Sequence, residues 1–316
     1  MKKSSHKLLT FAALFGTATA IIHVANKFVA ATAQLKEMLD FSQKNYYDWR
    51  FGKVYYTKTG KGSPVLLVHD MMPGSSGYEW NKIVKALSTE HTVYTIDLLG
   101  CGRSDKPGIT YTNFLYVQLI CDFVKEVIKE KTNVIASGLS GSFAVMAGLN
   151  EKEYLGKIML INPPSIRSLQ KMPTEKDKLL KLFLEIPVFG TLIYHMVVSR
   201  ESTTNLFIEN MYYNPFHADS DMIDAYYESA HKGGCYAKYM YASLASKFMN
   251  INISHALSSI DNCIYIVSGE EVNSASTADE YVKINPAIET AVVKKTKRLP
   301  HAEDPEHFLE HVGIFF

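Results

Sequence analysis

The clearest chemical pattern in the chain is the run of small and apolar residues at 138–142, Gly-Leu-Ser-Gly-Ser. It follows an apolar stretch at 133–136 and precedes a segment of helical character that begins at Ser140. A sharp strand-to-helix turn presents a serine hydroxyl at a helix N-terminus, and it needs small residues two before and two after that serine. Gly138 and Ser142 meet this need, so the pattern predicts that Ser140 is a nucleophile. A simple capped helix start is the alternative.

A second segment could supply the backbone donors that a serine nucleophile requires. Residues 69–76, His-Asp-Met-Met-Pro-Gly-Ser-Ser, follow an apolar run at 64–68. An acyl-transfer intermediate is stabilised by two backbone N–H groups, one just after the nucleophile and one from the loop after the third strand. We expect Gly141 and Met71 to donate them, an ordinary Pro-Gly turn being the alternative. The other residues expected to shape this site are His69, Asp70, Leu139 and Arg298.

A third segment, residues 97–107, has the sequence D-L-L-G-C-G-R-S-D-K-P. It matches neither G-x-x-x-x-G-K-[ST] nor G-x-G-x-x-G, so it predicts a structural turn rather than a phosphate loop. In this order and spacing, the three segments resemble the α/β-hydrolase superfamily. The closest parallel is its capped branch of haloalkane dehalogenases, epoxide hydrolases and small esterases, over about Tyr46 to Phe316. Within that branch, a serine at the turn implies ester or other acyl chemistry, and the resemblance implies no cofactor.

The expected catalytic acid departs from the family pattern. The family acid follows the seventh strand in a G-x-x-D pattern, but this chain has Val272 at that position. Glu270 and Glu271 lie two and one residues before it. The other family position, after the sixth strand, carries Asn162, which cannot act as a carboxylate. Glu271 is therefore the candidate acid, and Glu270 is the alternative.

The expected catalytic histidine departs further. The family ending resembles G-H-x-P-x-x-E-x-P-E-x-F, whereas residues 297–308 are K-R-L-P-H-A-E-D-P-E-H-F. Alignment on the shared prolines and glutamate places Arg298 in the histidine slot, and arginine cannot accept a proton at neutral pH. Either His301 shifts to reach Ser140, or the triad is lost. The spacing favours loss, with Arg298 paired to a carboxylate after the seventh strand.

Three hypotheses for the function follow from these residues. The first is an α/β hydrolase of carboxylesterase type that acts by serine acyl transfer on a small, apolar, ester-like substrate, with His301 as its base. Its activity is weakened because Arg298 occupies the usual histidine position. The second is a catalytically silent protein of the same fold that binds a small molecule or a protein partner. A membrane-tethered scaffold with a vestigial pocket is a third, weaker hypothesis.

The surrounding pattern predicts an α/β fold with a mostly parallel eight-stranded sheet and helices on both faces. Strands are expected at 46–51, 53–56, 64–68, 92–96, 133–136, 157–161, 263–267 and 290–293. After residue 164 the alternation gives way to helical segments, which predicts a helical cap between strands 6 and 7, over the ligand-binding edge of the sheet. The domains expected are an N-terminal helix at 1–40, a core at 41–164 and 256–316, and the cap at 165–255.

Aromatic residues are concentrated in the expected cap. Helix packing explains most of them, and we hypothesise that a few line an apolar pocket over Ser140. They are Tyr212, Tyr213, Phe216, Tyr226, Tyr227, Tyr236, Tyr239 and Tyr241.

The N-terminus differs in kind from the rest of the chain. Three lysines in the first seven residues precede an uncharged run at 8–26, which is long enough to cross a bilayer. A membrane anchor is the preferred interpretation. A secretory signal, with Ala-x-Ala at 18–20 or 31–33, and a surface-lying helix are the alternatives.

Composition excludes other classes. The 33 basic residues nearly equal the 32 acidic ones, so no overall charge favours nucleic acid. The four scattered cysteines predict free thiols, and no spacing indicates a metal site.

Overall fold

The computed structural model describes residues 2–40, 45–270 and 274–316. Its eight strands form one sheet in the order β1-β2-β4-β3-β5-β6-β7-β8. Strand β2 pairs antiparallel with β1 and with β4, and all other pairs are parallel. The predicted fold class, a mostly parallel eight-stranded α/β sheet, is confirmed. The strands are β1 (Asn45–Trp49), β2 (Gly52–Thr59), β3 (Ser63–Val68), β4 (His91–Ile96), β5 (Thr132–Ser137), β6 (Leu155–Ile161), β7 (Ile264–Gly269) and β8 (Glu289–Val293).

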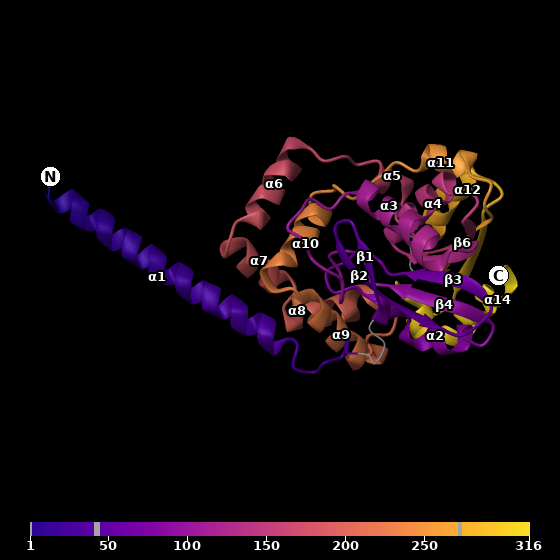
Figure 1. Cartoon of the computed structure of the whole chain (residues 1–316), viewed down its shortest axis with the longest axis horizontal. Coiled ribbons are helices and arrows are strands. Elements are labelled where there is room, and N and C mark those ends of the chain that lie inside the picture. The colour runs from indigo at the N-terminus through magenta and orange to yellow at the C-terminus, as the bar shows by residue number, and fades with distance from the viewer. Residues whose placement is uncertain (1, 41–44, 271–273) are drawn as a thin grey trace.

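Helices cover both faces of the sheet (Figure 1). One face carries α3 (Asn113–Phe123), continued by η2 (Val124–Ile128), together with α4 (Ser140–Asn150) and α12 (Ser274–Ile284). The opposite face carries η1 (Gly77–Trp80), α2 (Asn81–Leu87), α13 (Pro300–Glu303) and α14 (Pro305–Phe315).

Strand β3 shows why its apolar run forms a central strand. Successive side chains of a strand point to opposite faces. Val65 and Leu67 therefore pack with Trp80 in one buried cluster, while Leu66 and Val68 pack in the other. These four residues of β3 are fully buried, as the continuous apolar pattern predicts for a strand covered on both faces.

A helical cap lies between β6 and β7, in agreement with the predicted insertion. It contains, in chain order, α5 (Ile166–Leu169), α6 (Glu175–Glu185), α7 (Phe189–Val197), α8 (Arg200–Leu206), η3 (Phe207–Met211), η4 (Pro215–His217), α9 (Ser220–His231), η5 (Gly234–Tyr236), α10 (Lys238–Ala245) and α11 (Ser254–Ser259). Helices α6 and α7 meet at 101°. Side chains from η3 and α9 pack against the loop that follows β3.

The N-terminal helix α1 (Lys2–Thr32) extends away from the rest of the molecule and passes beside the cap (Figure 1). Its segment Thr10–Thr32 is 23 residues long and apolar enough to cross a membrane, with little of it buried. The buried Asn26 amide donates to Val188 O (3.0 Å), at the turn between α6 and α7. The ring of Phe15 stacks on that of Phe189 at 5.8 Å between centroids. These two contacts dock α1 on the cap.

Candidate functional site

The turn after β5 is built around Gly138. Strand β5 ends at Ser137, Gly138 has φ +52°, and α4 begins at Ser140. A positive φ of this size strains any residue other than glycine. A Cβ on Gly138 would also lie 2.0 Å from Asp70 Oδ1. The carboxylate of Asp70 thus fills the space directly above this turn.

Ser140 lies at the start of α4 and is fully buried. Its hydroxyl donates to the backbone carbonyl of His69 at 2.6 Å. A serine activated for attack donates instead to the nitrogen of a general base. In this structure the Ser140 proton is therefore directed to a carbonyl oxygen.

Asp70 takes one of the two backbone donors that the sequence assigns to a reaction intermediate, together with the N–H of Leu139. Its Oδ1 accepts from the N–H of Met71 at 2.7 Å and from the N–H of Leu139 at 2.8 Å. The other expected donor, Gly141 N–H, donates to Gly138 O at 3.1 Å. Met71 N–H, one of the two expected donors, therefore donates to the protein's own carboxylate.

Arg298 completes the arrangement by binding the second oxygen of the same carboxylate. Its Nη2 donates to Asp70 Oδ2 at 2.6 Å, and Nε lies 3.3 Å from that oxygen. Asp70 is almost fully buried, whereas the Arg298 side chain is 42% exposed. The Asp70 charge holds the pKa of Arg298 above its ordinary value, so this side chain is a permanent cation.

Asn162 positions the Arg298 backbone. It lies just beyond β6 with φ +43°, and its amide donates to Lys297 O (2.8 Å) and Arg298 O (3.0 Å). Its carbonyl oxygen accepts from Gly269 N–H at the end of β7 (3.1 Å). The residue at one of the family's acid positions therefore joins two strand ends to the segment that carries Arg298.

His301 lies in a different environment from Ser140. It is fully buried, its ring is 4.5 Å from that of Trp80, and its Nε2 is 3.4 Å from Glu79 Oε1. Within the described part of the chain, neither ring nitrogen of His301 has a hydrogen-bond partner. The structure thus brings His301 to the buried carboxylate of Glu79 and does not join it to Ser140 as a base.

Glu79 is a buried charged residue that the sequence interpretation missed. Its Oε2 accepts from Asp70 N–H (3.3 Å) and from the Tyr226 hydroxyl (3.2 Å). Burial alone would raise the pKa of Glu79, but the neighbouring His301 holds it below its usual value. Glu79 thus lies beneath the Asp70 backbone as a second carboxylate of the site.

His69 fixes the loop after β3. Its Nδ1 donates to Asp70 O (2.7 Å), and its Nε2 accepts from Leu98 N–H (3.0 Å). The two bonds assign the neutral form of the ring, with its proton on Nδ1. Through these two bonds, His69 connects the Asp70 backbone after β3 to the Leu98 backbone after β4.

The candidate acids after β7 do not pair with Arg298 in the described structure. Glu270 is exposed, and its Oε2 accepts from Lys295 N–H at 2.7 Å. Glu271 lies outside the described residues. The suggested ion pair between Arg298 and Glu270 is therefore corrected: the partner of Arg298 is Asp70, on the loop after β3.

The cap aromatics above the site form a packed cluster. Tyr212 and Tyr226 are buried with Phe207 and Leu299. In contrast, Phe216 is 94% exposed and Tyr213 is also exposed. Packing therefore accounts for the aromatic side chains nearest the site.

Comparison with known protein families and curated proteins finds similarity to hydrolases. A model described as the alpha/beta hydrolase family matches residues 65–311. A 2-hydroxy-6-oxo-6-(2'-aminophenyl)hexa-2,4-dienoic acid hydrolase of Metapseudomonas resinovorans is 27% identical over 34% of this chain and 37% of its own length. The chain thus spans little more than a third of that relative. A proline iminopeptidase of Heyndrickxia coagulans is 20% identical over 86% of this chain and 98% of its length.

Solved structures agree on the fold. A serine hydrolase involved in carbazole degradation has a TM-score of 0.71 at 18% identity, covering 86% of this chain and 98% of its own. A membrane phospholipase A has a TM-score of 0.69 at 16% identity, covering 100% of this chain and 98% of its own.

Proposed function

Because this chain belongs to the alpha/beta hydrolase family yet fills its own site with an ion pair, we propose that it is a ligand-binding protein silent in serine acyl transfer. The observation that carries this proposal is the position of Asp70 Oδ1, which accepts from both Met71 N–H and Leu139 N–H. Hydrolases of this fold keep such a pair of donors open for the oxyanion of the intermediate. Here the protein's own Asp70 side chain accepts from both.

We further infer that Gly138, rather than Ser140, stands at the nucleophile position of the turn. In hydrolases of this fold, the nucleophile follows the strand directly, in a strained turn, and the next N–H is an oxyanion donor. Gly138 follows β5 directly with φ +52°, and the next N–H, that of Leu139, points to Asp70. In that register the nucleophile has been replaced by a residue without a side chain.

The base supports the same conclusion. Arg298 occupies the expected histidine slot and is held by Asp70, while His301 is packed against Glu79. Loss of the base in a triad hydrolase lowers the rate by about 10⁴–10⁶-fold.

Serine acyl transfer by Ser140 on a small, apolar, ester-like substrate is the second candidate. It is favoured by the strand–turn–helix surroundings of Ser140 and by the hydrolases among the relatives. It requires Ser140 to leave the His69 carbonyl and His301 to leave Glu79, so that the two can meet.

A fluorophosphonate probe separates the two candidates, because it modifies only activated serines. We expect the full chain to remain unlabelled at Ser140, by peptide mass spectrometry, under conditions that fully label a serine esterase of the same fold. An adduct on Ser140, together with ester turnover that Ser140→Ala abolishes, would establish the hydrolase instead.

We also propose that α1 anchors the chain in a membrane and is retained in the mature protein. The segment after α1 is held by the cap: Lys36 pairs with the buried Asp224 at 2.5 Å, and Met38 N–H donates to Glu228 at 2.6 Å. Within α1 itself, the buried Asn26 amide donates to Val188 O at 3.0 Å. Cleavage at 31–33 would remove this contact, which favours a retained anchor. The full chain is expected to stay in the membrane fraction after an alkaline carbonate wash, with its N-terminal peptide intact.

A further inference from the structure

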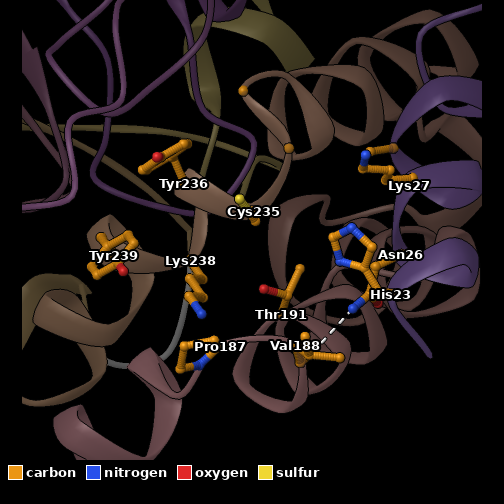
Figure 2. A pocket seen from close by; sticks show the side chains of 13 residues that line it. His23, Asn26, Lys27, Pro187, Val188, Thr191, Cys235, Tyr236, Lys238 and Tyr239 are labelled. Atoms are coloured by element: carbon orange, nitrogen blue, oxygen red, sulfur yellow. Dashed lines mark hydrogen bonds between the residues drawn. The ribbon is translucent and has the colours of Figure 1, made fainter. Parts of the chain in front are cut away.

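A cavity of about 480 Å³ lies between α1 and the cap, away from the Asp70–Arg298 site (Figure 2). Its walls come from α1, from the turn between α6 and α7, and from the segment around η5. His23 and Lys27 lie on the α1 side, and Lys238 lies on the opposite side (Figure 2). Three parts of the chain, distant in sequence, thus enclose one space.

Two buried polar side chains reach this cavity. Thr191 is 2% exposed, its hydroxyl has no hydrogen-bond partner in the described part of the chain, and its oxygen points into the space (Figure 2). Lys238 is 3% exposed, and its ammonium donates to Ile186 O at 2.9 Å. An ammonium has three donors, and a buried charge is costly without a counter-charge. Lys238 therefore calls for an acceptor with negative charge, and the Thr191 hydroxyl can donate a hydrogen bond to the same acceptor.

The charge around the cavity has the same sign. Lys27 and Lys238 line it together, and no acidic residue is among its lining residues. The nearby Glu185 is already bound by Lys181 at 2.6 Å. An anionic ligand would thus complement two lysines without an opposing carboxylate in the wall.

The surroundings indicate where such an anion comes from. The cavity adjoins residues 23–30 of α1, in the C-terminal part of the proposed membrane span. Apolar side chains on α1 and on the neighbouring α6–α7 pair are exposed, beyond what a surface in water favours. They include Val24 and Phe28 on α1, and Leu182, Phe183 and Met196 on the cap. A charged cavity beside exposed apolar side chains matches a lipid, which has an anionic head and apolar tails.

We propose that this cavity binds the phosphate headgroup of an anionic bilayer lipid. Lys238, Thr191 and Lys27 hold the phosphate, and the acyl chains lie along the exposed apolar surface of α1 and α6–α7. The inference rests on the proposed ligand-binding function and on the membrane anchor, and it names the ligand class.

Cysteine protection tests this proposal on the full chain, because Cys235 lines the cavity and is exposed. Cys263 is also exposed but lies before β7, so it is an internal control. In nanodiscs of phosphatidylcholine with phosphatidylglycerol, we expect maleimide to react with Cys235 several-fold more slowly than in phosphatidylcholine alone. The rate at Cys263 stays the same.

Lys238→Met and Thr191→Val should weaken this protection, raising the phosphatidylglycerol needed for half-protection about tenfold for the lysine. The matched control is Lys152→Met, an exposed lysine paired with exposed Asp261. Thr191→Val keeps the side-chain shape, and a thermal unfolding curve identifies any variant that fails to fold.

Equal Cys235 rates in the two lipid compositions would overturn the proposal, as would wild-type protection in Lys238→Met. Equal protection by inorganic phosphate in detergent would assign the cavity to a free anion and overturn the lipid assignment. Failure of the anchor is distinct, because such a chain would not enter the nanodiscs. Failure of the silent-site proposal is also distinct, because only Ser140 labelling reports on it.

Discussion

Arg298 Nη2 lies 2.6 Å from Asp70 Oδ2, and this contact joins residues 228 positions apart across the turn where a hydrolase would hold its substrate. The other oxygen of Asp70 accepts from two backbone N–H groups. A carboxylate with three such partners is held in one position by charge-assisted hydrogen bonds. The pair therefore stabilises the loop after β3 and blocks the donors at the same time.

Removal of Arg298 should destabilise the protein, because it leaves the buried Asp70 carboxylate without its counter-charge. We expect Arg298→Ala to lower the free energy of unfolding by about 2–3 kcal/mol, below the full value for a buried pair because Arg298 is partly exposed. Lys152→Ala removes one partner of an exposed pair and should change it by less than about 0.5 kcal/mol. Urea unfolding compares the two. If both variants changed the free energy of unfolding by the same small amount, Arg298 would not be needed to stabilise the buried Asp70 carboxylate.

Ester hydrolysis should appear when the blocked donors, the missing nucleophile and the missing base are restored together. The variant Asp70→Gly, Gly138→Ser, Arg298→His frees the donors, supplies a hydroxyl and supplies a base. We expect it to exceed wild type in p-nitrophenyl acetate turnover by at least about 10²-fold, since a serine and its base together supply far more than this in triad enzymes.

The control for this gain is the double variant Asp70→Gly, Arg298→His, which retains Ser140 but has no side chain at 138. It should stay near wild type. A double variant as active as the triple one would identify Ser140 as the nucleophile and refute the proposed register.

The stability of the protein should fall in acid through Glu79. Its pKa is held below the usual 4.5, so its ionised form contributes stability above about pH 4.5, and this contribution is lost as the pH falls through the lowered value. Glu79→Gln should unfold more easily than wild type at pH 7, and the difference should shrink below pH 4.5. Glu175→Gln, at an exposed acid, should leave the pH profile unchanged. If Glu79→Gln kept the wild-type dependence of stability on pH, Glu79 would not be the group whose protonation destabilises the protein in acid.

The fold could be predicted from the sequence because its signals are local. The apolar run of β3 is buried on both faces, and the alternation of strands with helices stops where the cap begins. Hydrophobic period and turn residues carry this information without any knowledge of tertiary contacts.

The site could be predicted only in part, because its chemistry depends on distances between remote residues. The sequence predicts that Arg298 takes the histidine slot, but its partner Asp70 is known only once β3 and the C-terminal segment meet. The sequence signal that could have identified this partner was the carboxylate of Asp70, directly after His69 and beside the expected donor Met71. The turn itself is ambiguous, since Gly138 and Ser140 are both small, and the end of β5 decides which has the positive φ.

Thiol reactivity should divide the cysteines into two classes. Burial raises the pKa of Cys101 and of Cys121 to about 12, so both stay as unreactive thiols at neutral pH. Cys235 and Cys263 are exposed. We expect two maleimides per folded chain and four after denaturation. Modification of Cys101 in the folded chain would show that the core around it opens.

Gly138→Ala should be one of the most destabilising single changes in the chain. The added Cβ meets the Asp70 carboxylate at 2.0 Å, and the backbone has φ +52°. Gly234→Ala is a matched control, because its φ is +57° but its Cβ would meet nothing within 4 Å. The control should lose about 1–2 kcal/mol from backbone strain alone, and Gly138→Ala should lose about 3 kcal/mol or more.

A double-mutant cycle then identifies Asp70 as the cause of the extra loss. In Asp70→Gly the space above the turn is empty, so adding Gly138→Ala should cost only the backbone strain seen at Gly234. The coupling between the two sites, measured by urea unfolding, should therefore be at least about 1 kcal/mol, as for other residues in direct contact. Additive losses would show that the carboxylate does not occupy the position above Gly138, and the account of a self-filled site would fail with it.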